Sequence, residues 1–360
     1  MRRILWLIST CVVGCSSPPS QNPPVDGSMV GIDGLVDAPP QRRELGIEVS
    51  SPGGDQTADI AIVKNVGVGV IPLTFTWSTL EPNGNGFDGD AVGFLNFGMA
   101  YYRDHGLRVV LSIPVVDTVA TFVPSDLAGQ SIGSPAVIAR AQALVTKVLE
   151  QAGPELEYLV LSNEVDINLA DGVPTWSELA ALVAAMAATA HELRPDVKTG
   201  VSVSATAVLH HDAEPLALLH ASDVAFVTYY DAGNFGTTSG DVAADIATVV
   251  AATDRPVVFK ELGYATGPLL GGSETGETTF VGDLFSGWDA HADRIPLVIY
   301  SRMFDGELSS CTSQAADYGL GSDPSFIQFL CTLGLRTYAD QPKAAWATFV
   351  AAATSRTWAD

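Results

Sequence analysis

From residue 44 to the C-terminus, near-continuous apolar runs alternate with stretches of helical periodicity. The helical stretches cover residues 90–105, 135–152, 175–194, 241–253, 277–292 and 343–353. In the second of them, Ile138, Ala141 and Val145 share one face, and Gly153 with Pro154 ends the helix. The apolar runs predict eight strands, at residues 44–50, 67–77, 107–117, 158–166, 198–207, 223–231, 255–266 and 295–305.

This alternation predicts an α/β fold. Strands that are apolar along their whole length are typical of a parallel sheet that helices cover on both faces. Eight strand–helix units in this length fit a closed (β/α)8 barrel, or TIM barrel, better than an open sheet. We therefore expect one domain over residues 44–360.

The first 43 residues have a different pattern and predict two segments ahead of the barrel. Arg2 and Arg3 precede an apolar run at residues 4–13, which is too short to span a bilayer and fits a signal peptide at residues 1–14. Residues 15–43 are rich in Pro, Gly and Ser and lack periodicity. Such a segment cannot bury enough apolar surface to fold, so we expect a disordered tether.

The string "VVGC" at the end of the apolar run resembles the lipobox of bacterial lipoproteins. The resemblance implies cleavage after residue 14 and acyl chains on Cys15, which would hold the chain to a membrane through lipid alone. Ser16 favours the outer membrane, with the barrel in the periplasm or at the cell surface. The alternative is a plain secretory signal with an incidental cysteine.

The composition narrows the classes of partner. The formal net charge is −23 and the isoelectric point is about 4.4, which argues against a nucleic-acid partner and leaves neutral sugars open. After cleavage and lipidation, Cys311 and Cys331 remain, as a candidate disulfide or as two unpaired thiols. Residues 209–215 lack a repeated ligand spacing, so we expect no metal there. We also expect no cofactor and a monomeric chain.

Polar residues gather where the predicted strands end, which is where barrels of this kind carry their active sites. Glu164 and Glu261 each close an apolar strand, three strand–helix units apart, so they should face each other across the barrel mouth. Two opposed carboxyls are what cleavage of a glycosidic bond requires. The other residues at these ends are Trp77, Asp117, Asn163, Asp166, Tyr229, Tyr230, Asp231, Tyr300, Arg302 and Asp305.

Several of these segments resemble glycoside hydrolase clan A, a group of retaining (β/α)8-barrel glycosidases. They are "TFTWSTLEP", "SNEVD", "DVAFVTYYD", "VVFKELGYAT" and "LGLRTYADQPKAAWATF". The resemblance implies a retaining glycosidase acting on an oligo- or polysaccharide, with Glu164 as acid/base and Glu261 as nucleophile. It also implies that Asn163 binds the sugar 2-hydroxyl and that Tyr230, or Tyr229, orients the nucleophile.

Four further residues are candidate substrate contacts. Trp77 could stack on a sugar ring or lie in the core, and Asp166 could bind sugar or shape its loop. Tyr300 stands where a tryptophan is common in the clan, and Arg302 follows it on the same predicted strand. The chain departs from the clan in lacking an arginine at the end of the second strand and a histidine at the third.

Other interpretations stay open. Glu164 could cap a loop or pair with Arg302. Lys260, beside Glu261, is expected to point to the opposite face, because side chains alternate along a strand. The same barrel could also serve a non-catalytic carbohydrate-binding lipoprotein, or a transglycosylase that uses the same two glutamates.

Overall fold

The computed structural model describes residues 43–358, except 51, 154–155, 170–171, 173, 232–234 and 236–238. The predicted signal peptide, Cys15 and nearly all of the predicted tether therefore lie outside the described residues. No helix of the described part has the length and apolar character needed to cross a bilayer.

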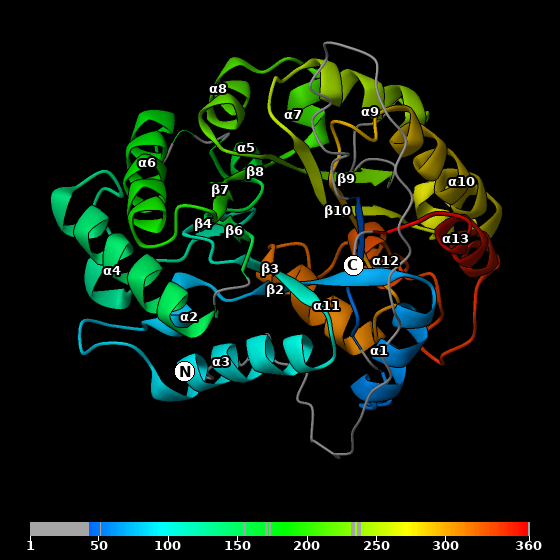
Figure 1. Cartoon of the computed structure of the whole chain (residues 1–360), viewed down its shortest axis with the longest axis horizontal. Helices are drawn as coiled ribbons and strands as arrows, with labels where there is room; N and C mark the ends of the chain where they lie inside the picture. The colour runs from blue at the N-terminus through cyan, green and yellow to red at the C-terminus, as the bar shows by residue number, and fades with distance from the viewer. Residues whose placement is uncertain are drawn as a thin grey trace, which may run out of the picture.

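A parallel sheet forms the centre of the domain (Figure 1). Its strand order is β7-β6-β3-β2-β1-β11-β10-β9-β8. Only Val201 separates β7 from β8, so these two are halves of one strand, and that strand pairs with β6 on one side and β9 on the other. The sheet is thereby closed into the predicted barrel. The strands are β1 (Glu44–Ile47), β2 (Val68–Thr74), β3 (Arg108–Ser112), β6 (Tyr158–Val160), β7 (Lys198–Gly200), β8 (Ser202–Ser204), β9 (Ala225–Asp231), β10 (Val257–Tyr264) and β11 (Leu297–Tyr300).

Helices surround the strands, as Figure 1 shows for α3, α4, α6, α9, α10 and α13. Ser134 caps α4, and Thr175 with Glu178 forms the capping box that begins α6. The helices are α1 (Gln56–Asn65), α2 (Trp77–Leu80), α3 (Gly89–Asp104), α4 (Pro135–Gln151), α5 (Val165–Asn168), α6 (Trp176–Leu193), α7 (Ala205–Leu209), α8 (Ala213–Ala221), α9 (Val242–Ala251), α10 (Glu274–Ala290), α11 (Leu308–Asp317), α12 (Pro324–Cys331) and α13 (Ala344–Thr354). A small antiparallel hairpin joins β4 (Val116–Asp117) to β5 (Ala120–Thr121).

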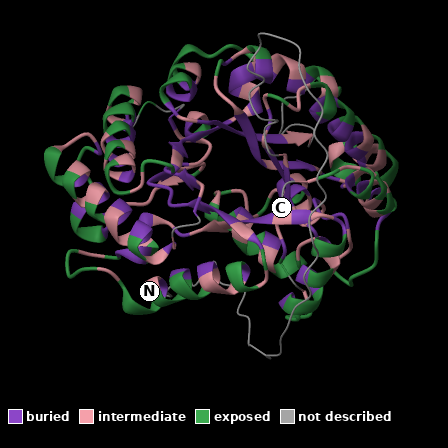
Figure 2. Ribbon diagram, viewed as in Figure 1, coloured by how far each residue is buried: buried purple, intermediate pink, exposed green. Residues whose placement is uncertain are grey.

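The buried side chains form two layers. Figure 2 shows burial on the strands and on the inner sides of the helices, with exposed residues on the outer sides. The larger layer lies between strands and helices. The smaller layer fills the inside of the barrel, so the barrel is a packed core rather than a channel, and polar strand ends lie above that core. The interior residues are Val70, Val110, Tyr158, Val160, Val224, Phe226, Val258, Leu297 and Ile299.

Two features outside the sheet lie at the opposite ends of the barrel. At the N-terminal edge, the Arg43 guanidinium lies over the rings of Trp288 and Trp358 and pairs with Asp289 at 2.8 Å. Arg43 was assigned to the tether, but it packs on the barrel. This cluster joins the residue before β1 to the last described residues of the chain.

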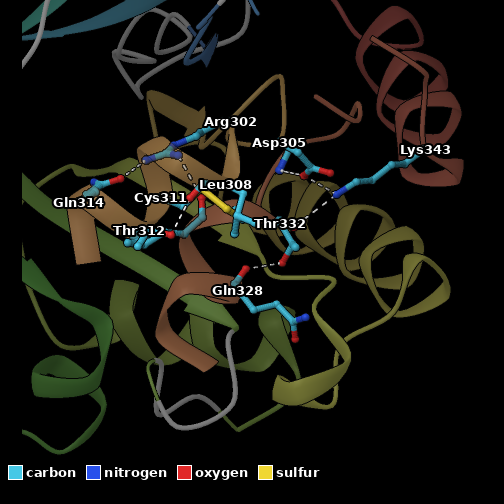
Figure 3. Close-up of a disulfide and its surroundings, with 12 residues drawn as sticks. Arg302, Asp305, Leu308, Cys311, Thr312, Gln314, Gln328, Thr332 and Lys343 are labelled. Atoms are coloured by element: carbon cyan, nitrogen blue, oxygen red, sulfur yellow. Dashed lines mark hydrogen bonds and ion pairs between the residues drawn. A yellow bond between two sulfur atoms is a disulfide. The ribbon is translucent and has the colours of Figure 1, made fainter. Parts of the chain in front are cut away.

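At the opposite edge, α11 and α12 follow β11 and are joined by a disulfide between Cys311 and Cys331, with a Cα–Cα distance of 5.6 Å (Figure 3). The candidate disulfide is thus present in the structure. The sequence analysis placed no helix between residues 305 and 343, so this pair of helices is an addition to the predicted architecture.

Candidate active site

A cavity of about 630 Å³ opens at the carboxyl ends of the strands. Strand-end residues line it together with apolar side chains from α3 and α12 and with Gln314 of α11. The two glutamates that the sequence singled out both lie in it, as do three of the other predicted site residues. The polar residues that line this cavity include Asp117, Thr118, Asn163, Glu164, Tyr230, Lys260, Glu261, Ser301 and Arg302.

Glu164 occupies a strained position at the end of β6. Its backbone is left-handed, with φ 42° and ψ 46°, and it precedes the first turn of α5. A non-glycine residue in this conformation costs free energy that the surrounding contacts must offset, and such strain concentrates at functional sites. Two hydroxyls hold the carboxyl group: Thr118 Oγ1 donates to Oε2 at 2.6 Å, and Thr228 Oγ1 donates to Oε1 at 2.7 Å.

Burial raises the pKa of Glu164 to about 7, and the negative charge of Glu261 adds to this effect. The hydrogen bonds from Thr118 and Thr228 act in the other direction, because they favour the ionised form. At neutral pH the carboxyl is therefore protonated in a large fraction of molecules. A carboxylic acid in this state can donate its proton to a bound group.

Glu261 lies on β10 and has the opposite electrostatic setting. Burial by itself would raise its pKa, but the Lys260 ammonium and hydrogen bonds from Lys260 and Tyr230 hold the pKa below its usual value. The Tyr230 hydroxyl donates to Oε2 at 2.8 Å, and Lys260 Nζ lies 2.6 Å from Oε1. Glu261 is thus kept ionised and oriented.

The prediction that Lys260 points away from Glu261 is wrong. The pairing of β10 with β9 shifts register between Phe259 and Glu261, which is the mark of a β-bulge. The bulge breaks the alternation of side chains, so both Lys260 and Glu261 line the cavity. Bulges near active sites commonly re-aim a side chain in this way.

Asn163 connects the two halves of the site. Its Nδ2 donates to Asp117 Oδ1 at 2.9 Å, while its Oδ1 accepts from Ser202 Oγ at 2.8 Å and from Lys260 Nζ at 2.6 Å. The amide oxygen is therefore occupied by protein donors. A bound sugar could therefore accept a hydrogen bond only from the second N–H of the amide.

Tyr230 is the tyrosine that contacts the nucleophile candidate, and its hydroxyl oxygen accepts a hydrogen bond from Ser301 Oγ at 3.1 Å. Tyr229 points to the other face of β9, where its hydroxyl donates to Asp245 at 2.8 Å. Of the two alternatives for orienting Glu261, the geometry therefore selects Tyr230.

Arg302 lines the cavity but does not pair with Glu164. Its nearest carboxylate is Glu48, at 3.6 Å, and it donates to Leu330 O at 3.1 Å and to Gln314 Oε1 at 3.4 Å (Figure 3). These contacts connect the end of β11 to the helices that carry the disulfide. The alternative in which Arg302 neutralises Glu164 does not hold.

Three predicted substrate contacts lie elsewhere. Trp77 belongs to α2 rather than to β2; it is fully buried, and its Nε1 donates to Glu81 at 2.9 Å. Tyr300 is also fully buried, and its hydroxyl donates to Glu277 at 3.2 Å. Of the two alternatives for Trp77, the core position is correct, and the substrate-contact prediction for Tyr300 is wrong because its ring lies in the core between the barrel and α13.

The third is Asp166, whose carboxylate accepts from the backbone and side chain of Ser204, at 2.8 and 2.6 Å. Asp166 joins α5 to the start of α7 instead of facing the cavity, so it is neither a sugar contact nor part of a turn within its own loop.

Thr118 and Thr228 were not predicted as site residues, because no sequence pattern distinguishes them from other hydroxyl residues. Tyr318 of the disulfide-linked helices, whose hydroxyl bonds Thr118, was not predicted either.

No protein-family model matches the chain, and no curated protein matches it. Solved structures do match. A variant of GH5_18 from Bifidobacterium longum subsp. longum, in complex with Manβ1-4GlcNAc, aligns with a TM-score of 0.68 at 18% identity over 87% of this chain and 78% of that chain. An exo-β-1,4-mannosidase from Opitutaceae bacterium strain TAV5 aligns with a TM-score of 0.69 at 16% identity, over 89% and 62% respectively.

A third structure, the apo form of β-glucosidase 1317, aligns with a TM-score of 0.61 at 13% identity, over 83% of this chain and 87% of that chain. At these identities the likeness concerns the fold. The (β/α)8 barrel is confirmed, and the solved structures that share it are glycosidases of the kind that the strand-end motifs resemble.

Proposed function

We propose that this chain is a retaining glycoside hydrolase in which Glu164 is the acid/base and Glu261 is the nucleophile. One observation carries the proposal: two carboxyls share one cavity, and their surroundings shift their pKa values in opposite directions, upward for Glu164 and downward for Glu261. Neutral and ionised carboxyls in one site are the starting state that glycosidic cleavage needs.

In the first step, the Glu261 carboxylate attacks the anomeric carbon of the sugar, and a carbon–oxygen bond forms as the glycosidic bond breaks. Glu164 gives its proton to the departing oxygen, which leaves as a neutral alcohol. Lys260 contacts one oxygen of Glu261 and Tyr230 donates to the other, so the two donors hold the carboxylate in place for this attack.

In the second step, the ionised Glu164 takes a proton from water, and the water oxygen attacks the anomeric carbon. The bond to Glu261 breaks, and the sugar leaves with the configuration that it had in the substrate. Asn163 offers its remaining N–H to a sugar hydroxyl beside the reacting carbon, where charge develops.

The names of the solved neighbours suggest the first substrates to try, since they are a β-1,4-mannosidase, a β-glucosidase and a protein that holds Manβ1-4GlcNAc. The test is a panel of aryl β-mannosides, β-glucosides and β-linked oligosaccharides, with product configuration followed by NMR. Hydrolysis with retention, abolished in Glu261→Ala, supports the proposal. No hydrolysis of any glycan would favour a carbohydrate-binding protein.

We also propose that the enzyme is tethered to the bacterial cell envelope through lipid on Cys15. The support is the apolar run that stops at "VVGC" and the Pro-rich segment after it. Wild-type protein should partition into detergent and incorporate labelled palmitate, whereas Cys15→Ala should do neither. A wild-type protein that stays unlabelled and in the aqueous phase would contradict this.

A further inference from the structure

Lys260 is the residue of the candidate site whose position the strand pattern did not predict. It is a lysine with 3% of its surface exposed, and it lies beside the candidate nucleophile on the bulge of β10. A buried ammonium is costly unless several acceptors surround it. The placement of a charge here therefore needs a reason beyond packing.

The contacts of its ammonium supply that reason. Lys260 Nζ lies 2.6 Å from Glu261 Oε1 and 2.6 Å from Asn163 Oδ1, so a single group bridges the carboxylate and the amide. The first of these belongs to β10 and the second to the end of β6, on opposite sides of the barrel mouth. No other described side chain bonds to both of them.

The bridge determines which way both partners face. Because Asn163 Oδ1 accepts from Lys260, the amide must turn its N–H groups toward Asp117 and the cavity. Because the Lys260 ammonium also contacts Glu261 Oε1, the orientation of this carboxylate is fixed. The second strand does not end in the arginine that many members of the clan have there. In this chain Lys260 brings a cation into the site from β10.

We propose that Lys260 is a positioning residue of this site: its ammonium fixes the carboxylate of the candidate nucleophile and, through Asn163, the donor that a sugar hydroxyl meets. This inference rests on the proposed glycosidase function. Lys260 acts through its two partners, so its loss should change the protonation of Glu261 as well as the rate.

The other groups around Glu261 set the direction of that change. Glu164 and Asp117 are negative or can become so, and they disfavour a second charge, while Arg302 is positive and stays in place when Lys260 is removed. Tyr230 donates a hydrogen bond, and Tyr318 is neutral. With Lys260 gone, burial and the two acidic neighbours outweigh the remaining donors, so the pKa of Glu261 should rise.

The experiment compares kcat/KM against pH for wild type, Lys260→Met and Lys260→Arg. Lys260→Met should lower kcat/KM by about 10²-fold at its optimum, the typical loss for one fixed electrostatic contact. Its acid limb, which reports ionisation of the nucleophile, should move to higher pH. Lys260→Arg keeps the charge, so its acid limb should stay near that of wild type while its rate falls less.

Two results would overturn the role. One is a uniform loss in Lys260→Met at all pH values, with the acid limb unmoved. The other is an acid limb that moves equally in Lys260→Met and Lys260→Arg. The matched control is Lys343→Met, which removes another buried lysine with carboxylate partners outside the cavity; it should lower the melting temperature without moving the acid limb.

A second readout separates this proposal from the proposed function. Carboxyl ¹³C NMR of glutamate-labelled protein, with Glu261 assigned through Glu261→Gln, follows the titration of this group without any substrate. An upward shift in Lys260→Met supports the positioning role even if every glycan panel is negative. An unshifted titration in a folded variant contradicts it even if the wild type is an active glycosidase.

Discussion

Two clusters in this barrel combine one buried lysine with two carboxyl groups, and only one of them opens to a cavity. At the mouth, Lys260 contacts Glu261, and Glu164 lies across from them. Beside α13, Lys343 lies 2.7 Å from Asp305 and 3.9 Å from Glu277 (Figure 3 shows the first pair). Both clusters contain the same kinds of residue, so the difference between them lies in their access to the cavity.

The second cluster is closed. Glu277 is fully buried and Lys343 is 5% exposed, and the lysine also donates to Thr266 Oγ1 at 3.1 Å and to the Thr332 carbonyl at 3.3 Å. Burial raises the pKa of Glu277 to about 8, so it too is largely protonated at neutral pH. None of these residues lines the cavity. A raised carboxyl pKa therefore identifies a catalytic acid only where substrate can reach the group.

The largest expected effect separates the two clusters directly. Glu261→Ala should reduce turnover of every glycoside by roughly 10⁴-fold or more, because in the proposed mechanism this carboxylate forms the covalent intermediate. Azide should restore part of the activity and give product of inverted configuration. The measurement is single-turnover and steady-state hydrolysis of aryl glycosides.

Its matched control is Glu277→Gln. Since Glu277 is mostly neutral at pH 7, the amide resembles the group that it replaces, and activity should change by less than about threefold. A comparable loss in Glu277→Gln and Glu261→Ala would remove the distinction between an open and a closed cluster.

The next effect depends on the leaving group. Glu164→Ala should slow hydrolysis of glycosides with poor leaving groups by about 10²- to 10⁴-fold, because these need a proton on the departing oxygen. Activated aryl glycosides need no proton, so their first step should be close to wild type. Burst kinetics with both substrate types give the comparison, and an equal loss on both would contradict Glu164 as the acid.

Thr228→Val should have a smaller effect, on the basic limb of the plot of kcat against pH. The proposed mechanism needs protonated Glu164, so activity should fall as pH rises through about 7. The Thr228 hydroxyl stabilises the ionised form, and Thr228→Val should therefore move this limb to higher pH. If the limb stays in place in a folded variant, the bond from Thr228 does not tune the acid.

The smallest effect concerns stability in the closed cluster. Burial gives Glu277 a pKa of about 8 in the folded chain, against the usual value of 4.5, so the folded state holds its proton while the unfolded state loses it. The free energy of unfolding should thus fall as pH rises from about 4.5 to 8, by on the order of 1 kcal/mol per pH unit at most. Glu277→Gln should show a weaker fall in thermal melts at pH 5, 6.5 and 8. Parallel stability curves for the two proteins would show that this carboxyl does not hold a raised pKa.

Much of the barrel follows from the apolar pattern, because parallel strands covered on both faces must be apolar along their length. Most of the predicted strands end too late, however: residues 295–305 contain β11 only at Leu297–Tyr300, although the predicted strand 223–231 ends with β9 at Asp231. Met303 and Phe304, which follow it, are as buried as strand residues but pair with no strand. Hydrophobicity reports burial and does not report ladder hydrogen bonds, so it cannot locate a strand end.

The residues of the candidate site also fall into a group that the sequence predicts and a group that it does not. Glu164 and Glu261 were accessible to prediction because a carboxyl that closes an apolar strand is costly and so stands out. Lys260 was misplaced because a bulge has no clear signal in one sequence, and side-chain alternation then gives the wrong face. Thr118 and Tyr318 come from a hairpin and a helix that follow different strands, and only the closed fold brings them together.

The Arg43 cluster has a consequence for how the molecule would stand on a membrane. Arg43 lies over the rings of Trp288 and Trp358 at the end of the barrel where the strands begin, and the cavity opens at the end where they finish. In the proposed anchoring, the lipid on Cys15 would therefore be attached to the end of the barrel that lies opposite the cavity. The mouth would be turned away from the bilayer, toward glycans that approach from the surrounding medium rather than toward sugars on the lipids of its own membrane.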